Sequence, residues 1–87
     1  MKQLKCKFNY SKSANKFFTK HKDIEEMFKK NIINENPNTD IKALKGFKGL
    51  LRMRIKDYRI IFKVVNGQIV IIEVLLAGNR GEIYKKL

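Results

Sequence analysis

The sequence contains one cysteine, one proline, one histidine and no tryptophan among its 87 residues. A single cysteine excludes an internal disulfide and every metal site built from several cysteines. No apolar run approaches the roughly 18–20 residues that a membrane-spanning helix needs. The pattern of a signal peptide is also missing, because Met1 leads directly into a short alternating segment. We therefore expect a cytoplasmic protein without a membrane segment, and we assign it no metal site and no cofactor.

Acidic residues are also scarce. Eight Asp and Glu stand against 20 Lys and Arg, which gives a formal net charge of +12 at pH 7. So large a charge on a small chain indicates a polyanionic partner, and nucleic acid is the first candidate. A membrane surface is the second, but no suitable basic amphipathic helix is present. The length predicts one domain, and a hydrophobic content of 44% is enough for a globular core.

The first half of the chain predicts one strand and two helices. Alternation of apolar and polar residues in KQLKCKFN, residues 2–9, is typical of a half-buried strand. Ser11 is placed to cap a first helix, and Asp23 to begin a second, which has Glu26 three residues further on. NENPNTD, residues 34–40, predicts a loop. The side chains expected to be buried are Ala14, Phe17 and Phe18 on the first helix, and Ile24, Met27, Phe28 and Ile32 on the second.

After Gly49 the patterns are typical of strands. Residues 51–56 alternate apolar with basic, residues 58–65 are β-branched and aromatic, and residues 68–76 form the most apolar run, which predicts a central strand. Asn66-Gly67 indicates a hairpin. A three-residue loop at 65–67, with Gly67 left-handed, would place Glu73 opposite Arg59. It would also keep four apolar side chains on the core side: Val70, Ile72, Val74 and Leu76.

This order of elements, β-α-α-β-β-β, predicts an α+β fold. Two N-terminal helices are expected to pack on one face of a small, largely antiparallel sheet. A short segment after residue 76 completes the chain.

Arginine is the unusual residue of this sequence, because only four of its 20 basic residues are arginines. Three of them fall within LRMRIKDYRIIF, residues 51–62. Residues two apart on a strand share a face, so Arg52 and Arg54 are expected to project together. A tight hairpin at residues 56–57 would place Arg54 opposite Arg59, and like charges in that arrangement are destabilising. An anion between the guanidinium groups removes the conflict, and their planar fork suits phosphate. The alternative interpretation is a solvated strand face.

The run LKGFKGLLRMRIKDYRIIFKVVNGQIVIIEVLLAGNRGEIY, residues 44–84, closely resembles the RelE-like branch of the RelE/ParE toxin superfamily. It shares a leucine–x–glycine lead, a basic–x–basic strand, and a Tyr-Arg pair followed by apolar residues. A closing Gly-x-Arg and an Ile-Tyr pair complete the resemblance. The amino-terminal strand and helices also fit. We therefore interpret residues 1–87 as a single RelE-like toxin domain.

The resemblance implies the toxin of a type II toxin–antitoxin pair. Such toxins are ribosome-dependent endoribonucleases, or mRNA interferases, that cut mRNA in the A site by attack of a 2′-OH on the neighbouring phosphate, without a metal. The implied partners are the ribosome, mRNA and a cognate acidic, RelB-like antitoxin. By position, the residues implied in catalysis are Arg54, Arg59, Arg80 and Tyr84. The residues assigned to RNA binding are Arg52, Lys45, Lys48 and Lys56.

The proton acceptor of such a reaction stays open, because arginine does not readily accept a proton. The candidates are Lys45, Lys48, Lys56 and Glu73, or a group of the ribosome. Glu73 has a second interpretation, in which it only holds Arg59 in place. Two other functions also remain open. One is that of the ParE-like sister branch, whose members poison DNA gyrase, and the other is a non-catalytic, basic RNA-binding domain.

Overall fold

The protein is a five-stranded sheet with two helices on one side, as the computed structural model shows for residues 6–34, 39–67, 69–79, 81, 83 and 85. The strand order is β1-β5-β4-β3-β2; β1 pairs in parallel with β5, and the other neighbours are antiparallel. The elements are β1 (Cys6–Tyr10), α1 (Lys12–Lys20), α2 (Lys22–Asn34), β2 (Asp40–Ala43), β3 (Leu51–Ile55), β4 (Tyr58–Asn66) and β5 (Val70–Asn79). The predicted α+β class is confirmed.

Strand β2 was not predicted from the sequence. The predicted loop at residues 34–40 is shorter at both ends, because Asn34 ends α2 and Asp40 begins β2. Residues 35–38 lie outside the described part of the chain. Within that part, no helix is long and apolar enough to cross a membrane.

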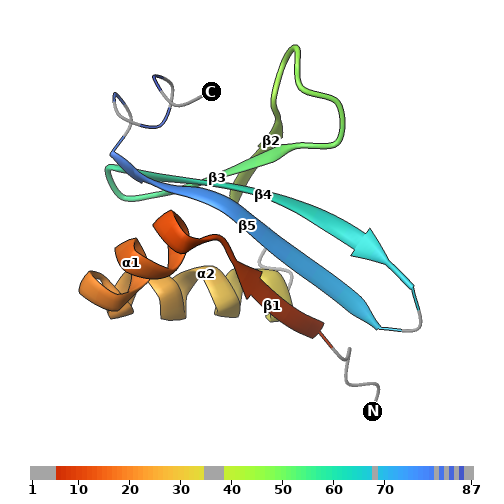
Figure 1. Ribbon diagram of the computed structural model, residues 1–87, viewed down its shortest axis with the longest axis horizontal. Coiled ribbons are helices and arrows are strands. Elements are labelled where there is room, and N and C mark those ends of the chain that lie inside the picture. Colours follow the sequence, from red (N-terminus) through yellow and green to blue (C-terminus); the bar gives the residue numbers. More distant parts are fainter. Residues whose placement is uncertain are drawn as a thin grey trace.

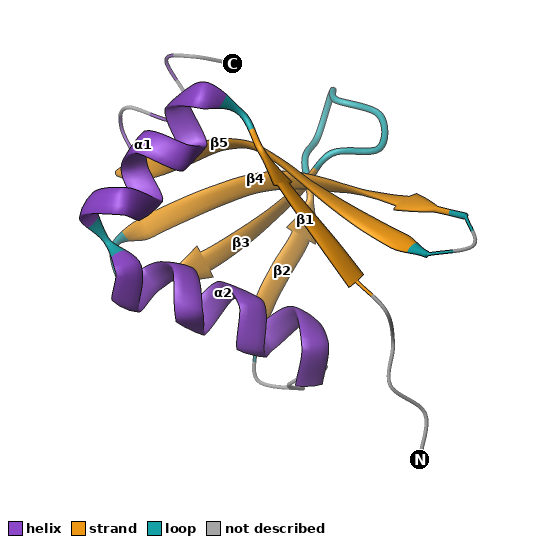
Figure 2. Ribbon diagram, turned by 60° about the horizontal axis from the view of Figure 1, so that its bottom comes forward, coloured by secondary structure: helices purple, strands orange, loops and turns teal. Residues whose placement is uncertain are grey.

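Both helices lie on the same side of the sheet (Figures 1 and 2). Ser11 caps α1 as predicted, because its hydroxyl oxygen accepts a 3.1 Å hydrogen bond from the Ala14 amide. The same hydroxyl donates a 2.7 Å bond to the Leu75 carbonyl, so it also ties the start of the helix to β5. His21 joins the two helices: its amide donates to the Phe18 carbonyl and its own carbonyl accepts from the Ile24 amide.

The main core lies between the helices and the sheet. Ile24 and Phe28 of α2 are fully buried, and Ile32 is partly buried against the same cluster. These residues are four apart and form a narrow stripe along the helix. Met27 lies beside that stripe and is 38% exposed, so the prediction that it is buried was wrong. The fully buried residues of the cluster are Ala14, Phe18, Ile24, Phe28, Met53, Ile55, Ile60, Phe62, Ile72 and Val74.

The β4–β5 hairpin has a different register from the predicted one. Asn66 pairs with Val70, so the connection lies at residues 67–69, two residues later than expected, and Gly67 is not left-handed. Glu73 consequently pairs with Lys63, and the prediction that it faces Arg59 was wrong. Both registers keep Glu73 out of the core, which is why its charge could not distinguish them.

A bulge at Leu75 then changes which side chains of β5 face the helices. Phe62 pairs with Val74 and Ile61 pairs with Leu76, so Leu75 has no partner on β4. An extra residue shifts the alternation of the strand by one. Leu76 therefore falls on the side away from the helices, against the prediction, and Ala77 packs against the core in its place.

Candidate anion-binding face

The sheet face that points away from the helices carries the arginines, and we call it the open face. Its composition follows from the alternation of each strand, since Met53, Ile60 and Phe62 fill the helix side. Two rows of side chains cross it from β2 to β5. One row is Asp40, Arg54, Arg59 and Gly78, and the next is Lys42, Arg52, Ile61 and Leu76.

Arg54 and Arg59 lie directly opposite each other, as predicted, because Ile55 pairs with Tyr58 across a two-residue turn. Lys56 begins that turn with a φ of 54°, a left-handed conformation that few residues with a side chain adopt. The tight turn therefore fixes the pairing that brings two guanidinium groups together. Like charges in directly opposite positions repel, and burial strengthens the repulsion.

Arg59 is buried, with 7% of its surface exposed. Its Nη1 donates a hydrogen bond of 3.4 Å to the Tyr58 carbonyl. None of the ion pairs among the described residues involves Arg54 or Arg59. Buried charges are ordinarily paired, so a guanidinium in this state is suited to hold an anion that comes from outside the described chain.

Two further cations of the open face, Arg52 and Lys63, differ from this pair. Arg52 Nη2 lies 3.2 Å from Asp40 Oδ1, and the Arg52 side chain is only 12% exposed. Lys63 Nζ lies 3.3 Å from Glu73 Oε1. Because both cations already have a carboxylate, they are less available to a phosphate than Arg54 and Arg59. Arg52, which was predicted to bind RNA, thus makes an internal ion pair with Asp40.

The predicted lysines lie at the borders of the face. Lys45 and Lys48 are exposed in the loop between β2 and β3, which rises from the side of the sheet away from the helices (Figure 1). In this loop Gly46 and Gly49 have φ values of +86° and +82°, which favour glycine. Lys56 lies at the hairpin turn, and its Nζ is 3.9 Å from Oδ2 of Asp23 on α2.

Two predicted site residues, Arg80 and Tyr84, lie outside the residues that the structure describes. Sequence reasoning also missed a basic residue, Lys42, which lies beside Arg52 on the open face. Residues 40–43 do show the alternation of a strand, because Asp40 and Lys42 alternate with Ile41 and Ala43. Four residues beside an Asn-rich loop are too few for this alternation to predict a strand.

The described part of the chain contains no group of three His, Cys, Asp or Glu side chains that could hold a metal ion. Glu73, one of the candidate proton acceptors, pairs with Lys63 and is not beside Arg59. Among the described residues, the Arg54–Arg59 pair is thus suited to stabilise negative charge, and Glu73 is not placed to accept a proton beside it.

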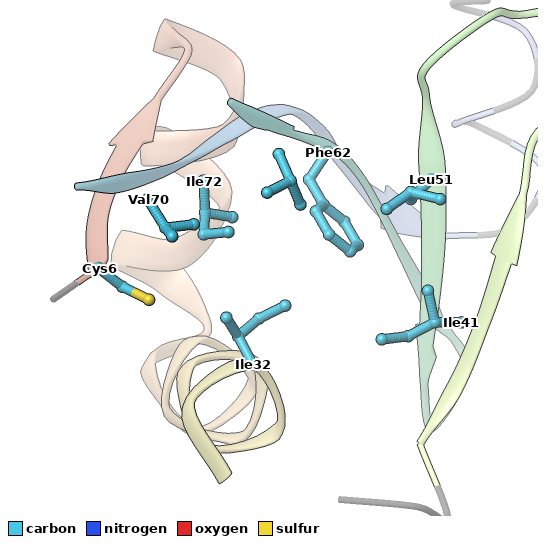
Figure 3. A pocket seen from close by; sticks show the side chains of 8 residues that line it. Cys6, Ile32, Ile41, Leu51, Phe62, Val70 and Ile72 are labelled. Atoms are coloured by element: carbon cyan, nitrogen blue, oxygen red, sulfur yellow. The ribbon is translucent and has the colours of Figure 1, made fainter. Parts of the chain in front are cut away.

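A hollow is present on the other side of the sheet, at the end where α2 stops. It is an open apolar pocket of about 300 Å³ (Figure 3). It is lined by Cys6, Ile32, Ile41, Leu51, Phe62, Val64, Val70 and Ile72. With no charged side chain in its lining, this pocket is suited to apolar contacts and not to the chemistry of the open face.

The chain matches a family model, the ParE toxin of type II toxin–antitoxin system, parDE, over residues 8–80. The chain belongs to this family. It is therefore a type II toxin of the RelE/ParE superfamily, as the resemblance predicted.

The fold of the toxin is also found among solved structures. A chain of the crystal structure of the RelB–RelE antitoxin–toxin complex from Methanococcus jannaschii is similar, with a TM-score of 0.63 and 24% sequence identity. The similarity covers 91% of this toxin and 98% of that chain. No curated protein matches the toxin.

Proposed function

We propose that this toxin is a ribosome-dependent endoribonuclease that cuts mRNA through the arginines of its open face. The observation that carries the proposal is the Arg54–Arg59 pair, which places a buried guanidinium opposite an exposed one with no carboxylate partner among the described residues. A phosphate diester between them would offset their repulsion and accept a bidentate hydrogen bond from each fork.

The proposed reaction is attack of a ribose 2′-OH on the adjacent phosphate. The O2′–P bond forms while the P–O5′ bond breaks; a base takes the 2′ proton, and the leaving 5′ oxygen gains one. Arg54 and Arg59 would stabilise the negative charge that grows on the phosphate oxygens. By the resemblance, Arg80 adds a further cation and Tyr84 stacks on a base.

We also propose a cognate antitoxin as the partner that keeps the toxin inactive. The net charge of +12 favours an acidic partner. The apolar pocket favours a partner segment that also carries apolar side chains, since its lining residues Ile41 and Val64 are 38% and 39% exposed. The similar chain from Methanococcus jannaschii belongs to an antitoxin–toxin complex, which supports this assignment.

Primer extension on mRNA in a translating extract tests the nuclease. Wild-type toxin should produce new 3′ ends at codons in the A site, and Arg54→Ala and Arg59→Ala should reduce them by about 10²–10³-fold. Lys16→Ala is a matched control, because it removes one exposed positive charge from α1. Equal cleavage by the arginine variants and the control would rule out the open face as the active site.

A second candidate function is inhibition of DNA gyrase. It is favoured by the family match, which is to the ParE toxin, and by the missing proton acceptor beside the arginines. Supercoiling by gyrase should then fall when the toxin is added, while the same preparation leaves mRNA in the translating extract uncut. Uninhibited gyrase together with A-site cleavage would eliminate this candidate.

A further inference from the structure

The described strands contain two carboxylates, Asp40 and Glu73, and both lie on the open face. They stand on either side of the Arg54–Arg59 pair. Asp40 is on β2, which pairs with the strand of Arg54, β3. Glu73 is on β5, where it lies opposite Lys63 of β4. A face that serves to bind a polyanion would bind it more tightly without them, so their presence calls for a physical explanation.

The contacts of Asp40 are selective. In the strand register it lies directly opposite Arg54, yet its Oδ1 accepts the hydrogen bond of Arg52, at 3.2 Å. The Arg52 side chain is only 12% exposed, whereas Arg54 is exposed. Asp40 thus neutralises one arginine of the adjacent pair and leaves the other one open.

Glu73 has the same effect on β4. Its Oε1 lies 3.3 Å from Lys63 Nζ, and Lys63 is on the same face of β4 as Arg59, four residues further on. Each carboxylate therefore occupies one cation beside the site, while Lys42, opposite Arg52, is exposed and in none of the ion pairs of the described residues. The unpaired guanidinium groups of the described open face are those of Arg54 and Arg59.

We infer that Asp40 and Glu73 are specificity-determining residues that confine the bound phosphate to Arg54 and Arg59. They do so by occupying Arg52, the next same-face residue of β3, and Lys63, four residues along β4 from Arg59, so that an RNA backbone binds less readily at those positions. This inference rests on the proposed function, because it requires the open face to bind RNA. Selectivity by repulsion costs affinity, and the carboxylates accordingly weaken binding to RNA in general.

The test measures the affinity for a short single-stranded RNA by fluorescence anisotropy over a series of salt concentrations. Asp40→Asn should bind more tightly than wild type. Its plot of log affinity against log salt should also be steeper by about 0.7, the slope that one additional phosphate contact gives with a single strand. The gain in affinity should disappear in the double variant Asp40→Asn/Arg52→Met, because it lacks the Arg52 guanidinium that the Asp40 substitution would free.

Glu25→Gln is the matched control, since it also raises the net charge by one. Glu25 lies on α2, where it pairs with Lys29 at 3.5 Å, and not on the open face. A general effect of charge would change both single variants alike, whereas the inference requires a larger change in Asp40→Asn. Glu73→Gln gives an independent test on the other side of the site, with the same direction of effect.

The possible outcomes separate the inference from the proposed function. If wild type does not bind RNA at low salt, the proposed function fails. If wild type binds but Asp40→Asn and Glu73→Gln match Glu25→Gln in affinity and in salt slope, the confinement by carboxylates is refuted. Weaker binding by Asp40→Asn, with an unchanged circular dichroism spectrum, would also overturn it, because Asp40 would then orient Arg52 toward the RNA.

Discussion

Replacing Arg59 with methionine should stabilise the toxin and abolish the proposed cleavage of mRNA. Arg59 is 7% exposed, lies opposite Arg54, and has a carbonyl as its hydrogen-bond partner among the described residues. Methionine keeps most of the apolar stem and removes both the desolvated charge and the cross-strand repulsion. Replacing buried charged groups by apolar ones of similar volume often stabilises a protein by about 1–4 kcal/mol.

We expect a gain of about 1–3 kcal/mol in the free energy of unfolding, because the missing guanidinium leaves some space unfilled. For a domain of this size, each kcal/mol moves Tm by about 4–8 °C, so the increase should be roughly 5–20 °C. Thermal unfolding followed by circular dichroism measures it. In the translating extract, cleavage by Arg59→Met should fall by about 10²–10³-fold.

Arg52→Met is the control for this experiment. Arg52 is also largely shielded from water, but it is paired with Asp40, whose side chain is 39% exposed and can return to water. Its replacement should change stability by no more than about 1 kcal/mol. A clear decrease of Tm in Arg59→Met would refute the reasoning, because it would show that the folded chain itself satisfies the Arg59 charge.

Three further predictions concern stability. Burial, together with the nearby Glu25 carboxylate, raises the pKa of Tyr10, and the Tyr10 hydroxyl is buried without a hydrogen bond among the described groups. A raised pKa of tyrosine contributes stability that is complete below about pH 10 and is lost as the pH rises further. Wild type should therefore lose more stability than Tyr10→Phe between about pH 9 and 11, as measured by paired urea titrations. At pH 7 Tyr10→Phe should be at least as stable as wild type; a loss above about 1 kcal/mol would indicate a hydrogen bond of this hydroxyl. Ser11→Ala removes both the helix cap and the bond to the Leu75 carbonyl, and should cost about 1–2 kcal/mol in urea unfolding, whereas a neutral result would contradict the cap. Lys56→Gly relieves the strain of a left-handed backbone conformation and should raise Tm by a few degrees. The lost ion pair with Asp23 is exposed and contributes little, so a decrease of Tm would mean that this pair stabilises the hairpin.

The sequence by itself determined the features that depend on local patterns. The alternation of Met53 and Ile55 with Arg52 and Arg54 established which side of β3 is buried, and the Lys56-Asp57 turn set Arg54 opposite Arg59. Local patterns also predicted both helices and the Ser11 cap, although α2 begins at Lys22, one residue before the predicted Asp23. These features could be predicted because each depends on residues that are close together in the chain.

The tertiary structure decided what depends on pairing between distant residues. Residues 69–72 and 74–77 are apolar without interruption, so several registers of β5 against β4 bury a similar surface. Packing selected the one that pairs Glu73 with Lys63, and a bulge at Leu75 moved Leu76 to the open face. Neither the register nor the bulge could be predicted from alternation, because a continuous apolar run does not alternate.

The same reason explains why Asp40 was missed. Its contact with Arg52 requires β2 to pair with β3 across a loop of seven residues, 44–50, and the four residues of β2 carry too little pattern to predict that strand. The sequence was sufficient to place three arginines on one face. That Arg52 is neutralised while Arg54 and Arg59 remain able to hold an anion was decided by Asp40, which only the assembled sheet brings beside Arg52.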